Sequence, residues 1–155
     1  ERICQALGLN VKQMLSQSFM VSADNAHAVH PNHPEYADAG NAPIMGGGVV
    51  LKFNASQRYT TDGLSAALFR KVCGDAGVKV QSYCNRADIP GGSTLGHISL
   101  THVSVPTADI GLPQLAMHSA YETAAVADAL ALEDAMAAFY GKSLEVSAGG
   151  EYTLR

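Results

Sequence analysis

A short apolar segment that ends in an aspartate constrains the fold more than any other feature of the sequence. The segment Ser18 to Ser22 is typical of a buried strand, and Asp24 follows it where open α/β sheets place their ligand-binding groups. Three histidines come next at steps of three, at His27, His30 and His33. Pro31 and Pro34 exclude a continuous helix through this region. We therefore expect a strand end that continues into an extended loop.

The residue types around Asp24 suggest two different roles for this loop. Carboxylate and neutral imidazole are ligands that zinc prefers, and imidazole also transfers protons near neutral pH. A polar loop at the surface would have the same composition. The spacing of the histidines is consistent with either a metal or catalytic site or such a loop.

Length and composition restrict the class of protein. The chain has 155 residues, of which 47% are hydrophobic and 15% charged, as expected for one globular domain. A net charge of −4 without a basic stripe argues against nucleic-acid binding. No basic-then-apolar leader is present, and no apolar run approaches the roughly 20 residues that span a bilayer. Together with three cysteines at irregular spacing, these features predict a cytoplasmic protein without membrane association.

Helical and strand patterns alternate along the chain. The patterns predict helices near residues 1–7, 10–16, 62–74, 93–102 and 124–140, strands near 18–22, 49–53, 78–83, 108–110 and 114–117, and a weak hairpin from 144–146 and 152–154. This alternation favours an α/β fold in which a mixed sheet lies between helical layers. A loop as long as residues 28–48 is usually functional or disordered.

Two further features each have two interpretations. Lys52 is the one charge in the apolar strand 49–53, and it either faces water on an edge strand or points into a pocket that receives an acid. The glycine-rich turn at 90–94 precedes a predicted helix. Such a turn either cradles an anion or allows tight packing of the helix on the sheet.

Several segments together resemble the M18 aspartyl aminopeptidases. These segments are Ser22 to Asn32, Arg58 to Thr61, Gly92 to Gly96, Asp109 to Pro113, and Met117 to Ser119. The resemblance covers nearly all 155 residues in the same order. It implies a three-layer α/β/α sandwich with a mixed sheet, of the zinc-exopeptidase type, of which this chain is an incomplete part. Residues 1–155 would be the C-terminal portion of the catalytic domain.

The resemblance also implies roles for individual residues. Asp24 matches a ligand of one zinc ion, and His118 matches a ligand of the other. His27 matches a histidine that contacts substrate, and Lys52 matches the lysine that meets an acidic N-terminal side chain. Tyr59 is a further candidate for lining the pocket. The implied protein is a dinuclear zinc aminopeptidase that removes N-terminal Asp or Glu from peptides and assembles into a homo-oligomer, a dodecamer in the family.

The family's remaining site residues are not found in this chain. The general-base glutamate, the glutamate next to it, the bridging aspartate and the first histidine ligand lie upstream of the matching region, and the sequence contains no Glu-Glu pair. Three hypotheses remain open: part of an active aminopeptidase, an inactive truncated remnant acting as a binding or assembly module, or a small protein that binds metal through the histidine loop alone. The loop residues His30 and His33 are interpreted as hydrogen-bonding groups that order the loop.

Overall fold

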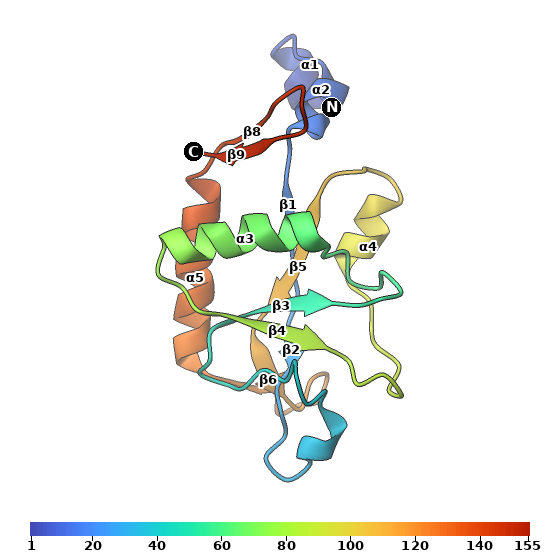
Figure 1. The fold of residues 1–155 in the computed structure, drawn as a ribbon, viewed down its shortest axis with the longest axis vertical. Coiled ribbons are helices and arrows are strands. Elements are labelled where there is room, and N and C mark those ends of the chain that lie inside the picture. The colour runs from blue at the N-terminus through green and yellow to red at the C-terminus, as the bar shows by residue number, and fades with distance from the viewer.

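A four-stranded mixed sheet lies at the centre of the computed structural model, which describes all 155 residues (Figure 1). Its strands are β1 (Met20–Ala23), β3 (Val49–Phe53), β4 (Val80–Cys84) and β5 (Thr107–Gly111), arranged in the order β1-β5-β3-β4. Strand β1 is parallel to β5 and β3 is parallel to β4, whereas β3 and β5 are antiparallel. The expected mixed α/β architecture is confirmed.

Two helices cover one face of this sheet. Helix α3 (Gly63–Asp75) and helix α5 (Val126–Tyr140) pack on the side chains that alternate toward them from β3 and β5. The resulting hydrophobic cluster contains Val49, Leu51, Ala66, Phe69, Cys73, Ala108, Ile110 and Ala135. Helix α3 begins at a capping box in which the Asp62 carboxylate accepts the Ser65 backbone N–H and the Ser65 hydroxyl accepts the Asp62 N–H.

The opposite face of the sheet carries buried polar side chains beside a small apolar cluster of Ala26, Val50, Tyr59 and Tyr83. Because side chains alternate along a strand, the register pairs Ser22 with Asp109 and Lys52 with Tyr83 on that face. Helix α4 (Leu95–Leu100) lies against β1 and β5 here, and the Gly96 N–H donates to the Ser22 hydroxyl. Coverage of this face thus depends on a helix of only six residues and on loops.

A second, smaller sheet continues from the first. It contains β2 (Ala26–His27), β6 (Pro113–Leu115) and β7 (Thr123–Ala124), with β2 parallel to β6 and β6 antiparallel to β7. Strand β1 passes into β2 through Asp24 and Asn25, while β5 passes into β6 through Leu112. Two paired segments therefore cross together from one sheet to the other, and Asp24 lies at the crossing.

The remaining elements lie away from the sheet. Helices α1 (Arg2–Ala6) and α2 (Val11–Ser16) and the hairpin of β8 (Leu144–Val146) and β9 (Tyr152–Leu154) gather at one end of the molecule, and the loop before β3 contains a 3-10 turn, η1 (Pro34–Tyr36), at the other. No helix of the chain is both long and apolar enough to cross a membrane.

Several predicted boundaries differ from the structure by one or two residues, and two of these differences have an identifiable cause. The fourth predicted helix begins after Thr94 and ends at Leu100, so Ser93 is not its cap. The Thr94 hydroxyl donates to Asp109 instead of capping the helix. The strand predicted over 114–117 ends at Leu115, because Ala116 takes a positive φ of 56° that cannot continue a strand.

Asp128 supplies the first testable prediction. This residue in the first turn of α5 is 1% exposed, and its carboxylate accepts the N–H groups of Gly46 (2.7 Å) and Gly48 (2.8 Å) just before β3. Removing the acceptor leaves these N–H groups without a partner, so Asp128→Ala should lower the free energy of unfolding by about 1–3 kcal/mol. The exposed Asp134 on the same helix is the matched control. Urea unfolding checks the prediction, and equal midpoints for Asp128→Ala and Asp134→Ala would contradict it.

Candidate functional site

Asp24 presents its carboxylate to solvent from a fixed backbone. Its N–H donates to Ile110 O at 2.9 Å, which continues the β1–β5 ladder one residue beyond the strand. The side chain remains 59% exposed. Gly111 makes this packing possible, because a Cβ on that residue would lie 1.9 Å from Asp24 O.

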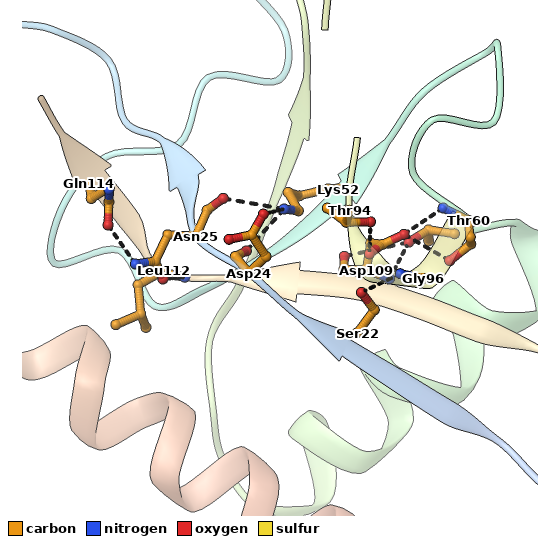
Figure 2. A network of polar contacts seen from close by, with 11 residues as sticks. Ser22, Asp24, Asn25, Lys52, Thr60, Thr94, Gly96, Asp109, Leu112 and Gln114 are labelled. Carbon is orange, nitrogen blue, oxygen red and sulfur yellow. Dashed lines mark hydrogen bonds and ion pairs between the residues drawn. The ribbon is translucent and has the colours of Figure 1, made fainter. Parts of the chain in front are cut away.

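Lys52 is buried beneath Asp24. The residue is 1% exposed, and its Nζ donates to Asp24 O at 3.0 Å and to Asn25 O at 3.2 Å (Figure 2). Nζ also lies 3.7 Å from the Asp24 carboxylate and 4.8 Å from the centre of the Tyr59 ring. The interpretation of Lys52 as a water-facing edge residue is wrong, since β3 lies between β5 and β4.

The Lys52 ammonium experiences opposing effects on its pKa. Burial lowers the pKa, while the carboxylates of Asp24 and Asp109 raise it. The buried Tyr59 ring is 6% exposed, and burial together with the same two carboxylates raises the pKa of its phenol. A buried cation thus lies between two acidic groups and an aromatic face.

Asp109 organises the polar face behind this cation. It is completely buried, and its carboxylate accepts the Thr60 N–H (2.6 Å), the Thr60 hydroxyl (2.8 Å) and the Thr94 hydroxyl. The Thr61 hydroxyl accepts the Asp109 N–H at 2.8 Å. Asp109 was not predicted to be a functional residue. It lies between the apolar residues Ala108 and Ile110. A single charge within an apolar strand is also the pattern that marked Lys52 as a candidate.

Asn25 connects the two paired segments at the crossing. Its amide nitrogen donates to the Gln114 side chain, and its amide oxygen accepts the Leu112 N–H at 3.2 Å (Figure 2). These contacts join the residue next to Asp24 with the strand that leads toward His118. No local pattern in the sequence indicated the pairing of Asn25 with Gln114, which is 89 positions away.

The two histidines matched to site positions extend from the smaller sheet. His27 lies in β2, and His118 lies in the loop between β6 and β7. Partial burial, then the nearby His118 and then the Lys52 charge lower the pKa of His27. The charges of His118 and Lys52 thus both act on the His27 imidazole.

A cavity of about 350 Å³ opens beside His27. His30, His33 and Arg86 line it, whereas Lys52 and Tyr59 do not. The loop histidines make hydrogen bonds within their own loop, as interpreted from the sequence. His30 Nδ1 accepts the Asn32 N–H at 3.2 Å, and His33 Nδ1 lies 3.1 Å from a Glu35 carboxylate oxygen.

The chain does not gather a complete set of metal ligands. No group of three or more His, Cys, Asp or Glu side chains is placed so that it could hold a metal ion. Asp24 and His118 remain single donors of the types that zinc accepts.

Comparison with known proteins gives one consistent family. Residues 1–140 match the model of the family described as aminopeptidase I zinc metalloprotease, M18. A probable M18 family aminopeptidase 2 of Pseudomonas paraeruginosa is 46% identical over 129 residues, which cover 83% of this chain and 30% of that protein. The chain spans about 30% of the length of the curated relatives it matches.

Solved structures agree with this match. The cryo-EM structure of the Ape4 and Nbr1 complex superposes with a TM-score of 0.80 and 37% identity, covering 90% of this chain and 27% of the matched chain. The mApe1 dodecamer of S. cerevisiae gives a TM-score of 0.77 at 24% identity, and the match covers 86% of this chain and 29% of the matched chain. An identity this low shows the likeness of fold alone.

Gly111 supplies the prediction for this site. In Gly111→Ala the new Cβ would meet Asp24 O at 1.9 Å and Asn25 Cα at 2.7 Å, so the crossing must move apart. Such overpacking should lower the free energy of unfolding by about 1–3 kcal/mol or more. The amide hydrogen of Ala26, which donates to Leu112 O, should also exchange faster with solvent.

Gly63 is the matched control for Gly111. A Cβ at that position meets no atom within 4 Å, so Gly63→Ala should change the free energy of unfolding by no more than about 0.5 kcal/mol. If Gly111→Ala unfolds at the same urea concentration as Gly63→Ala, the crossing is not as tightly packed as described.

Proposed function

Because this chain belongs to the aminopeptidase I zinc metalloprotease family, M18, we propose that it forms the C-terminal part of the catalytic domain of a zinc aminopeptidase. The proposal includes a three-layer α/β/α sandwich in the complete domain. Its second helical layer would extend the coverage that α4 begins on the polar face. It also includes upstream residues that supply the rest of the site, in keeping with the short share of the relatives' length that this chain spans.

The geometry of Asp24 is the observation that carries this proposal. Its backbone is fixed by Ile110 and Lys52, while its carboxylate stays open to solvent. A metal ligand benefits from both features, because a fixed backbone places the side chain and an open carboxylate leaves its oxygen lone pairs accessible. His118, from the neighbouring paired segment, would supply a nitrogen ligand to a second ion.

The chemistry of such a site divides between bound zinc and the protein. When bound, zinc supplies a water of lowered pKa and polarises the scissile carbonyl. Asp24 and His118 would each hold one ion, and a general-base glutamate from upstream would take the proton of the attacking water. In this chain His27 contacts the substrate, and its lowered pKa favours the neutral imidazole, which donates one hydrogen bond and accepts another.

We propose peptides with an N-terminal Asp or Glu as substrates. Two of the three ammonium hydrogens of Lys52 go to the carbonyl groups of Asp24 and Asn25. The Asp24 carboxylate lies 3.7 Å from the same Nζ, so the third hydrogen would meet the acidic side chain of the substrate when zinc holds that carboxylate, with Tyr59 beneath the ammonium as a supporting face.

Assembly into a homo-oligomer is part of the same proposal. The S. cerevisiae mApe1 structure is a dodecamer. In this chain several large apolar side chains are exposed, among them Tyr121 (86%), Val126 (77%) and Leu130 (57%). Val126 and Leu130 lie one turn apart on α5, and an exposed apolar helix face is commonly covered by another protein surface.

A second function is favoured by one observation. Asp24 and His118 are the only matched ligands in the chain, one for each ion, and the structure holds no group of three. An inactive remnant that acts as a binding or assembly module would have the same incomplete set of ligands. The intact mass of the natural protein separates the two functions. A mass well above that of 155 residues favours the enzyme, and a mass equal to it favours the remnant.

The ligand assignment predicts a loss of zinc. In the full-length polypeptide, Asp24→Ala and His118→Ala should each remove or weaken one of two zinc ions, with at least the 10- to 100-fold loss of affinity that changes around a metal site commonly cause. Elemental analysis after dialysis against a weak chelator measures the stoichiometry. Two retained zinc ions in both variants would disprove the assignment.

The proposed role of Lys52 predicts that its replacement changes the substrate preference. If its ammonium pairs with a substrate carboxylate, the contact contributes on the order of 1.5–3 kcal/mol. In the full-length enzyme, Lys52→Met should therefore lower kcat/KM for aspartyl and glutamyl substrates by roughly 10- to 150-fold. Activity on leucyl substrates should fall much less, because an apolar side chain loses no charged partner when the ammonium is removed.

The buried hydrogen bonds of Lys52 provide the competing interpretation. If Lys52 acts only by holding Asp24 and Asn25 in place, the variant should lose zinc and should lose activity on all substrates equally. Kinetics on paired aspartyl and leucyl substrates decide between the two roles. An unchanged ratio of the two kcat/KM values would mean that Lys52 does not recognise the acidic side chain.

A further inference from the structure

The loop that carries His118 has an unusual backbone. Strands β6 and β7 form a hairpin in which Leu115 pairs with Thr123, so residues 116–122 form its loop. Within this loop both Ala116 and His118 take positive φ values, 56° and 67°. Only one other non-glycine residue of the chain, Gln57, does so.

A positive φ at His118 changes where its side chain leaves the chain. The left-handed region is disfavoured for residues with a Cβ, so it persists only where surrounding contacts hold it. It also points the Cα–Cβ bond in a direction that neither a strand nor a right-handed turn would give. The direction of the His118 imidazole therefore depends on whatever fixes this backbone conformation.

Glu122 makes the contact that fixes it. Its carboxylate accepts the His118 backbone N–H at 2.6 Å, from the residue just before β7. The rest of the loop is organised in support, since the Ser119 N–H donates to Ala116 O and the Ser119 hydroxyl accepts the Tyr121 N–H. A hydrogen bond to a carboxylate is shorter and stronger than one between neutral groups.

We propose that Glu122 is a positioning residue for His118, holding the histidine in its left-handed conformation so that the imidazole faces the metal site. This inference rests on the proposed function, in which His118 is a zinc ligand. Glu122 acts through the backbone of His118. It neither binds the metal nor transfers a proton.

Three substitutions of Glu122 in the full-length enzyme separate the effect of side-chain length from the effect of charge. Glu122→Gln keeps the length of the side chain and an acceptor oxygen but removes the charge. Glu122→Asp keeps the charge but is one methylene shorter, so its carboxylate should not reach the His118 N–H. Glu122→Ala removes both, and the exposed Glu133→Ala on α5 is the matched control.

The affinity of each zinc site is measured by competition with a chelating indicator. Glu122→Ala and Glu122→Asp should weaken the zinc site that His118→Ala removes by about 10- to 100-fold and leave the other site unchanged, as loss of an outer contact to a ligand does. Glu122→Gln should bind both ions much as the Glu133→Ala control does. At saturating zinc, Glu122→Gln should also keep the pH profile of the parent enzyme.

Several outcomes would overturn the inference. If His118→Ala loses one zinc while Glu122→Ala and Glu122→Asp keep both at full affinity, Glu122 does not position His118, although the ligand assignment stands. If Glu122→Gln loses zinc or a limb of the pH profile as completely as Glu122→Ala, the carboxylate acts directly as ligand or proton carrier. If His118→Ala retains both ions, the proposed ligand set fails, and this inference fails with it.

Discussion

The buried ammonium of Lys52 is the interaction on which the site depends. It enters a sheet face that also holds Asp109, and it donates to the carbonyl groups of two consecutive residues where β1 passes into β2. A buried charge is tolerated only when it is paired and hydrogen-bonded, so a shift of the crossing that breaks these two bonds while Lys52 stays buried is strongly disfavoured. The Asp24 carboxylate lies 3.7 Å from the same ammonium but remains 59% exposed, because the closer hydrogen bonds of Lys52 go to the backbone.

The division of the sheet into two faces explains why an apolar core and a polar site occupy the same strands. Alternation along β3 sends Leu51 into the cluster beneath α3 and α5, and sends Lys52 to the opposite face. Strand β5 does the same with Ile110 and Asp109. Stability of the core therefore fixes the register, and the register places Lys52 and Asp109.

Much of the fold was predictable from local patterns. The long helices, the strand that holds Lys52 and the strand that leads to Asp24 follow from apolar periodicity and from signals such as the Asp62 cap. What the sequence could not reveal depends on distant partners. Thr94 was not identified as the residue before α4, because its hydroxyl bonds to the distant Asp109 instead of capping the helix. The hydrogen bond between the Asn25 and Gln114 side chains forms only once β1 and β5 are paired. His118 was found only through family resemblance, since nothing local predicts its left-handed backbone.

The pairing of β1 with β5 also sets the order of events as the protein is made. Asn25 and Gln114 stand 89 residues apart along the chain, and closing a loop of that length through a parallel pairing is slow compared with forming local helices and hairpins. During synthesis, Asp24 leaves the ribosome long before the strand that will hold it. The two paired segments meet only after α3 and β4 have been made, so any site built across them is completed only when this region has folded.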